Sequence, residues 1–264
     1  MNRSLRVLLL ALPLFLLGAA DAVSPQARFH EGAAAYRAGD YAQAEQAWRE
    51  VIIAGAVDGH ALYDLGNALY RQGQLGSAIL AWRQALVLSP REPDARANLG
   101  HARGQVRDQL EPQGHVPLVF FWQHSLALRE SATLGSSLLG FALGAWAWLR
   151  WRRRRQAREL GSLRPASWVA AVLGLLLLLS TVVTARSLAY EPGAVVLATE
   201  IAGRSAVGRD GVELFVLHEG AEVRAVELDA DHVLIVLSDG RRGWVPQAAV
   251  GLVRPGEGWE VAAD

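Results

Sequence analysis

Two long apolar runs dominate the pattern of hydrophobic and polar positions along the chain. Residues 131–149 carry no charged side chain over 19 positions, and residues 165–185 continue in the same way for 21 positions. At ~1.5 Å rise per residue, either run folded as a helix could cross a hydrocarbon layer of roughly 30 Å. The pattern therefore predicts a hairpin of two transmembrane helices.

The segment between the runs, residues 150–164, is rich in arginine and has a net charge of +6. Short loops with excess positive charge stay on the cytoplasmic side of a membrane, so both flanking regions are expected on the outer side. What this loop contacts there, a protein or only anionic lipid, stays open. The arginines that determine this topology are Arg150, Arg152, Arg153, Arg154, Arg155, Arg158 and Arg164.

The N-terminal residues 1–22 have the pattern of a secretory signal peptide. Arg3 and Arg6 precede an apolar stretch of 12 residues, and Ala20-Asp21-Ala22 fits the small-x-small cleavage site. An uncleaved anchor is the alternative. Either form exports the residues that follow, in agreement with the topology predicted from the arginine-rich loop.

The exported region 25–110 contains an internal repeat with a period of 34 residues. Residues 25–58 match residues 59–92 at ten identical positions, and a third copy begins at Pro93 and stops after one helix. Gly39 and Gly73 fall where each repeat needs a turn between its two helices. Trp48 and Trp82 are interpreted as filling the space between repeats. The third copy, 93–110, is expected to cap the stack.

This period and these positions resemble the tetratricopeptide (TPR) repeat. The resemblance implies a helical solenoid that binds protein segments in a groove lined by the first helix of each repeat. Tyrosine and arginine are enriched at binding hot spots, although Tyr36 and Tyr70 could instead serve only in packing. The groove positions carried over from the family are Phe29, Tyr36, Arg37, Tyr63, Asn67, Tyr70, Arg71 and His101.

The approach to the membrane, residues 111–130, is apolar but too interrupted to span, and is predicted to be an interfacial linker. Within the first span, Ser136, Gly140 and Gly144 form a stripe of small residues. Ala166, Ala170 and Gly174 form a similar stripe in the second span. Because small residues let membrane helices approach closely, these stripes are predicted to pack the hairpin on itself, with pairing to another membrane protein as the alternative.

The C-terminal region, residues 190–264, changes to the period of two that is typical of strands. Five short β runs are expected at 195–197, 212–217, 222–228, 232–237 and 243–245. Asp239-Gly240 is a hairpin signal between two of them. The stretches Leu217-His218-Glu219-Gly220 and Gly243-Trp244-Val245-Pro246 resemble the bacterial SH3-like (SH3b) domain, which implies a small barrel. Trp244 is the candidate surface residue of this domain, with core packing as the alternative.

Composition removes several classes of chemistry. The chain has no cysteine and no lysine, so thiol catalysis, disulfides, Schiff bases and Walker A loops are excluded. The histidines show no metal-ligand spacing, and the net charge of zero gives no global attraction to nucleic acid. We therefore expect a protein that is not an enzyme, has no cofactor or metal and binds no nucleic acid.

Taken together, the pattern predicts a multidomain membrane protein with an all-α TPR solenoid, a transmembrane helical hairpin and an all-β SH3-like small barrel. This order resembles the E-type proteins of bacterial aerotolerance (Bat) operons. The resemblance implies a noncatalytic adaptor of the bacterial inner membrane, with both exported modules in the periplasm. Its implied partners are von Willebrand A-domain membrane proteins and a MoxR-type AAA+ ATPase, in stress tolerance or envelope protein assembly. The alternative is a wall-sensing protein whose SH3b domain binds peptidoglycan.

Overall fold

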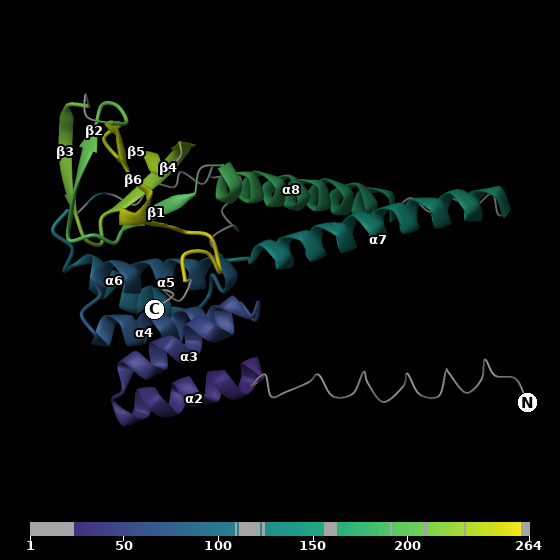
Figure 1. Cartoon of the computed structure of the whole chain (residues 1–264). Helices are drawn as coiled ribbons and strands as arrows, with labels where there is room; N and C mark the ends of the chain where they lie inside the picture. The colour runs from purple at the N-terminus through teal and green to yellow at the C-terminus, as the bar shows by residue number, and fades with distance from the viewer. Residues whose placement is uncertain are drawn as a thin grey trace, which may run out of the picture.

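The computed structural model describes residues 24–108, 110, 122, 125–155, 163–190, 192–208, 211–229 and 231–259. The predicted signal peptide, residues 1–22, lies outside the described residues, as does most of the predicted interfacial linker. Figure 1 shows a stack of helices and a β-sheet packed together, with a long helical hairpin extending from one side.

Five helices form the stack in the order in which they occur in the chain. They are α2 (Pro25–Ala38), α3 (Tyr41–Ile53), α4 (Gly59–Arg71), α5 (Leu75–Leu88) and α6 (Pro93–Arg103). The turns between the helices of each pair have Gly39 and Gly73 at φ values of 83° and 80°, as the sequence predicts. Glycine adopts this left-handed conformation without steric cost, so each pair can fold back sharply.

A glycine and a tryptophan fix the distance between the two helices of each repeat. A Cβ atom built on Gly32 would lie 2.8 Å from Nε1 of Trp48, and one built on Gly66 would lie 2.6 Å from Nε1 of Trp82. Both indoles are almost fully buried. Each tryptophan therefore packs against the glycine of its own repeat. The sequence analysis, which placed the tryptophans between repeats, did not predict this contact.

The hairpin consists of α7 (Leu128–Arg155) and α8 (Leu163–Tyr190) (Figure 1). Both are long and apolar enough to cross a membrane, judged by length and composition. Helix α7 continues five residues beyond Arg150, so the arginine-rich segment that was predicted as a loop begins as helix. The second helix begins at Leu163, close to the predicted start of the second span.

The two helices of the hairpin meet at a pair of glycines. A Cβ atom on Gly174 would lie 2.9 Å from the carbonyl oxygen of Gly135, so the two backbones are in close contact there. Gly140 and Gly144, by contrast, have no neighbouring atom within 4 Å of such a Cβ. The prediction that the stripe of Ser136, Gly140 and Gly144 packs the hairpin on itself is wrong, because the contact uses a different face of α7. The stripe predicted in the second span does contribute to the contact, through Gly174.

The C-terminal region forms a single antiparallel sheet of seven strands in the order β3-β2-β6-β5-β4-β1-β7. The strands are β1 (Gly193–Val196), β2 (Glu200–Arg204), β3 (Glu213–His218), β4 (Glu222–Asp229), β5 (His232–Val236), β6 (Arg242–Pro246) and β7 (Val250–Leu252), with the 3-10 turn η3 (Gln247–Ala249) before β7. The hairpin predicted at Asp239-Gly240 joins β5 to β6, with Gly240 at a φ of 86°.

This strand order differs from the predicted five-stranded barrel in two respects. The sequence pattern missed β2, because Glu200–Arg204 contains alanine and glycine in place of an apolar alternation, and it missed β7, which has three residues. The sheet is also open, since β3 and β7 form its two ends and do not pair with each other. The strand order therefore does not confirm the predicted closed SH3-like barrel.

The hydrophobic core of the helical stack includes residues from the sheet region, and the sheet has a second core of its own. Val195, Val253 and Trp259 from the sheet region pack with the buried leucines and tryptophans of the helices. Fully buried Gln84 on α5 donates from Nε2 to the carbonyl oxygens of Leu252 and Glu257, and its Oε1 accepts from Nε1 of Trp259 at 2.7 Å. The two modules, which the sequence suggests as separate domains, form one body.

An ionic cluster lies at the same junction. The carboxylate of Glu222 on β4, 9% exposed, pairs with Arg103 at 2.5 Å and with Arg83 at 3.3 Å. The carboxylate of Glu219 accepts from the amide of Gly76 at 2.8 Å and so caps α5. Gln74, at the start of that helix, provides no side-chain cap.

Two arginines attach the hairpin to this body. Arg91 pairs with Glu130 at the start of α7, and Arg254 donates to the carbonyl oxygens of Leu188 and Ala189 in the last turn of α8. A guanidinium at the C-terminus of a helix satisfies carbonyl groups that have no partner within the helix. The body is therefore attached to the end of the hairpin opposite the arginine-rich end of α7 (Figure 1).

Candidate functional site

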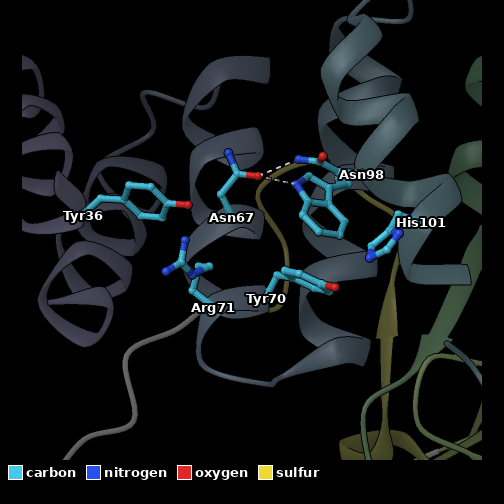
Figure 2. A pocket seen from close by; sticks show the side chains of 7 residues that line it. Tyr36, Asn67, Tyr70, Arg71, Asn98 and His101 are labelled. Carbon is cyan, nitrogen blue, oxygen red and sulfur yellow. Dashed lines mark hydrogen bonds between the residues drawn. The ribbon is translucent and has the colours of Figure 1, made fainter. Parts of the chain in front are cut away.

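A pocket of about 200 Å³ opens on the first helices of the repeats (Figure 2). It is lined by Tyr36, Asn67, Tyr70, Arg71, Trp82, Asn98 and His101, from α2, α4, α5 and α6. Five of these seven residues are among the predicted groove positions. No residue of the sheet lines it, because the sheet packs against α5 from another side.

The amide of Asn67 lies at the centre of the pocket and is held by two hydrogen bonds. Its Oδ1 accepts from Nε1 of Trp82 at 3.2 Å and from Nδ2 of Asn98 at 2.9 Å. Figure 2 shows that its NH₂ group consequently points away from these partners. The buried indole of Trp82 thus orients an amide donor in the pocket.

The first repeat lacks this arrangement. Ala33 stands where the second repeat has Asn67, and the buried Nε1 of Trp48 has no hydrogen-bond partner. Leaving a buried donor unsatisfied costs about 1–3 kcal/mol. The polar network therefore belongs to the second and third repeats, which places the pocket toward α4 and α6.

We expect Asn67→Ala to lower the free energy of unfolding by about 1–2 kcal/mol, because it leaves Nε1 of Trp82 without its acceptor. The reciprocal change, Ala33→Asn, is expected to raise it by about 0.5–1 kcal/mol by giving the indole of Trp48 a partner. Chemical unfolding followed by circular dichroism measures both. Equal effects of the two substitutions, in either direction, would contradict this account of the two repeats.

Arg71 places a positive charge at one side of the pocket. Its guanidinium carbon lies 4.7 Å from the centre of the Tyr41 ring, a cation–π distance. Tyr36 lies beside Tyr41 with ring centres 5.2 Å apart. Burial raises the pKa of Tyr36, and the charge of Arg71 opposes that rise. The hydroxyl of Tyr36 therefore stays protonated and can donate a hydrogen bond.

His101 and Tyr70 form the other side. Their ring centres lie 6.2 Å apart in an edge-on arrangement, and the Tyr70 hydroxyl accepts from Nε2 of Gln105 at 2.6 Å. The Tyr70 ring also packs on Trp82 at 5.6 Å. The lining residues include no carboxylate, so the pocket offers hydrogen-bond donors and a positive charge to whatever enters it.

The remaining predicted site residues lie elsewhere. Phe29 and Tyr63 are partly buried against the helical core, and Arg37 is exposed with its Nε donating to the carbonyl oxygen of Ala33. Trp244 is partly buried on β6, opposite Arg204 on one side and Leu234 on the other.

In the arginine-rich segment between the two apolar runs, Arg150 is exposed and lies over the Trp146 ring. The side chains of the other predicted topology residues lie outside the described residues: Arg152, Arg153, Arg154, Arg155, Arg158 and Arg164.

Two pocket residues, Trp82 and Asn98, were not predicted as groove positions. Trp82 was read only as a packing residue, although a buried indole needs an acceptor for its Nε1. The replacement of Ala33 by Asn67 at the same repeat position was the available signal. Asn98 lies on the incomplete third copy, where no second helix was present to show which side chains face the groove.

Asp64 on α4 gives the stack a pH dependence. Burial raises its pKa to about 6 from 3.8, and the charge of His60 opposes the rise. The folded chain then binds a proton more tightly than the unfolded chain, so its unfolding free energy should fall as pH rises from about 4 to 6. We expect Asp64→Asn to raise the free energy of unfolding by about 1–2 kcal/mol at pH 7 and to have little effect at pH 4. Urea unfolding at the two pH values checks this, and a pH-independent difference would contradict it.

Comparison with known proteins identifies the helices that form this pocket. Residues 66–106, from the middle of α4 to just beyond α6, match the TPR repeat family. No curated protein matches the chain in sequence. The match covers all the pocket residues except Tyr36. TPR repeats are protein–protein interaction modules, and this part of the chain is therefore a TPR repeat with an open, donor-lined pocket.

Proposed function

We propose that this chain is a noncatalytic, membrane-anchored adaptor that binds a segment of a partner protein in the pocket of its TPR repeats. The observation that carries the proposal is the chemistry of the pocket. An oriented amide, a guanidinium, a tyrosine hydroxyl and a histidine surround it, and the lining holds no carboxylate. Such a set suits backbone carbonyl groups and carboxylates.

The anchoring part of the proposal rests on the hairpin. Its two helices can cross a membrane, and the arginine-rich end of α7 lies opposite the body. With the arginines in the cytoplasm, the pocket lies on the outer face, which in a bacterial inner membrane is the periplasm. Arg91 and Arg254 then hold the body close to the membrane surface.

The resemblance to Bat E-type proteins supplies candidate partners. On that basis we propose that the pocket gathers von Willebrand A-domain membrane proteins into a complex that also involves a MoxR-type ATPase. The sheet, which has sequence features of SH3-like domains, would form part of the same complex.

Affinity purification of the full-length protein from detergent-extracted membranes tests this proposal. We expect the double variant Arg71→Glu, His101→Glu to lose about 90% of its recovered partners, since both exposed side chains line the pocket. The matched control is Arg37→Glu with His30→Glu, two exposed positions on α2 outside the pocket. Equal partner recovery by both variants, with unchanged melting temperatures, would contradict the proposal.

A further inference from the structure

The two complete repeats place a buried indole N–H at equivalent positions. The ring centres of Tyr36 and Trp48 lie 5.9 Å apart with an interplanar angle of 46°, and those of Tyr70 and Trp82 lie 5.6 Å apart at 45°. In each repeat the glycine on the first helix meets Nε1 of the indole. Nε1 of Trp48 therefore points toward the residue that follows this glycine, as Nε1 of Trp82 does.

In the second repeat that following residue is Asn67, and its carboxamide satisfies donors from two sides. Its Oδ1 accepts from Nε1 of Trp82 at 3.2 Å and from Nδ2 of Asn98 at 2.9 Å (Figure 2). Asn98 lies on α6, in the third copy, and the residue 34 positions before it is Asp64 on α4. The repeat geometry therefore places Asp64 beside Ala33, as it places Asn98 beside Asn67.

The first repeat leaves the groups around Ala33 without partners. Nε1 of Trp48, whose side chain is 2% exposed, has no hydrogen-bond partner among the described residues. The carboxylate of Asp64 accepts no hydrogen bond from the described residues, and its charged neighbours, His60 and Asp58, belong to α4 and its N-cap. Burial raises the pKa of Asp64 to about 6. One desolvated donor and one partly desolvated acceptor therefore flank Ala33.

A carboxamide complements this pair. The indole only donates and the carboxylate only accepts, whereas a carboxamide accepts through its oxygen and donates through its NH₂ group. A carboxylate ligand would be repelled by Asp64, and an ammonium or guanidinium group has no acceptor for the indole. We propose that an asparagine or glutamine side chain of the bound partner segment lies over Ala33, where its oxygen accepts from Nε1 of Trp48 and its NH₂ group donates to Asp64.

The second repeat shows that a carboxamide over this position reaches the indole. The carboxamide of Asn67 extends from its Cβ to within 3.2 Å of Nε1 of Trp82. Ala33 supplies only the corresponding Cβ, and it is partly exposed. Tyr36, one turn further along α2, lines the pocket. A segment bound in the pocket therefore continues over Ala33, and this step rests on the proposed adaptor function.

The first test supplies the carboxamide from the chain itself. Ala33→Asn is expected to stabilise the fold, so a loss of binding by this variant does not report unfolding. In affinity purification of the full-length protein we expect it to recover about fivefold less partner. The matched control is Ala34→Asn at the adjacent exposed position, which should stay within about twofold.

This test separates the present site from the pocket. Full partner recovery by Ala33→Asn, together with loss of partner from the Arg71→Glu, His101→Glu variant, would overturn the carboxamide site and leave the adaptor function standing. Full recovery by both variants would overturn the adaptor function and, with it, the present proposal.

The second test uses acetamide, the side-chain group of asparagine, on the full-length protein in detergent at pH 7.5. The indole N–H signals are followed by NMR, and that of Trp48 is assigned from its absence in Trp48→Phe. We expect acetamide to shift this signal saturably, with a dissociation constant on the order of 10–100 mM. The shift should vanish in Ala33→Asn, and Asp64→Asn should weaken binding about tenfold.

Acetate and methylammonium are the matched probes, since acetate lacks the donor and methylammonium lacks the acceptor. Neither should shift the Trp48 signal saturably. An acetamide shift that persists in Ala33→Asn, that acetate reproduces, or that never saturates would overturn the proposal. The Arg71→Glu, His101→Glu variant should respond to acetamide normally, because its substitutions leave Trp48, Ala33 and Asp64 unchanged.

Discussion

Replacement of Trp259 by alanine is expected to lower the free energy of unfolding of the whole body by about 3–5 kcal/mol. The indole is 2% exposed, donates to Oε1 of Gln84 at 2.7 Å and lies under the guanidinium of Arg49 at 5.1 Å. Its loss leaves a cavity between the helices and the end of the sheet. It also leaves Oε1 of Gln84 without its closest hydrogen-bond donor.

Denaturant unfolding of the detergent-solubilised protein measures this effect. The helical signal and the fluorescence of the remaining tryptophans should lose stability together, because Val195, Val253 and Trp259 of the sheet region belong to the core of the helices. The matched control is Glu257→Gln, an exposed side chain two positions away, for which a change within about 0.5 kcal/mol is expected. A Trp259→Ala protein as stable as the control would show that the C-terminal segment does not belong to the core.

Replacement of Glu222 by glutamine is the second large effect, with an expected loss of about 3 kcal/mol. The substitution keeps the shape of the side chain but removes the negative charge that faces Arg83 and Arg103. Burial lowers the pKa of Arg83, and the carboxylate of Glu222 opposes that shift. Without the carboxylate, two partly buried guanidinium groups would remain together without the negative charge that they share.

The same unfolding experiment measures it, with Glu227→Gln as the control on the exposed part of β4. Since Arg83 and Arg103 come from the helices and Glu222 from the sheet, the helical signal should respond to a substitution in the sheet. An unfolding transition in which the helices keep their original midpoint would mean that the two modules are independent.

The sequence predicted the local parts of this structure well. The period of 34 residues located the helices, and the turn glycines Gly39 and Gly73 take the conformation expected of them. Five predicted groove residues meet around one pocket because the repeat geometry is encoded within each repeat. Binding at those residues remains a prediction.

The union of helices and sheet could not be predicted in this way. Gln84 and Glu257 are 173 positions apart, and no periodic pattern connects them. Gly76 resembles an ordinary helix residue in the sequence, yet a Cβ atom there would lie 2.5 Å from the carbonyl oxygen of Val196. Likewise, Asp40 caps α3 from its own repeat, whereas α5 is capped by Glu219 from the sheet.

The union also changes how function should be tested. Deleting the helical repeats would expose Val195, Val253 and Trp259 to solvent and remove the partners of Glu222. A loss of partners from such a deletion would then report misfolding as readily as loss of the groove. Substitutions of exposed pocket residues avoid this problem, since they leave the shared core intact.

Site-specific photo-crosslinking in intact cells tests the proposed adaptor function most directly. A photoreactive amino acid at Asn98 would lie in the pocket, and one at the adjacent exposed residue Ala97 would lie outside it. The account predicts a discrete crosslinked partner from position 98 that is absent from position 97 and is lost in the Arg71→Glu, His101→Glu background. Crosslinks of equal yield from both positions, or a product from position 98 that survives in that background, would contradict binding in the pocket.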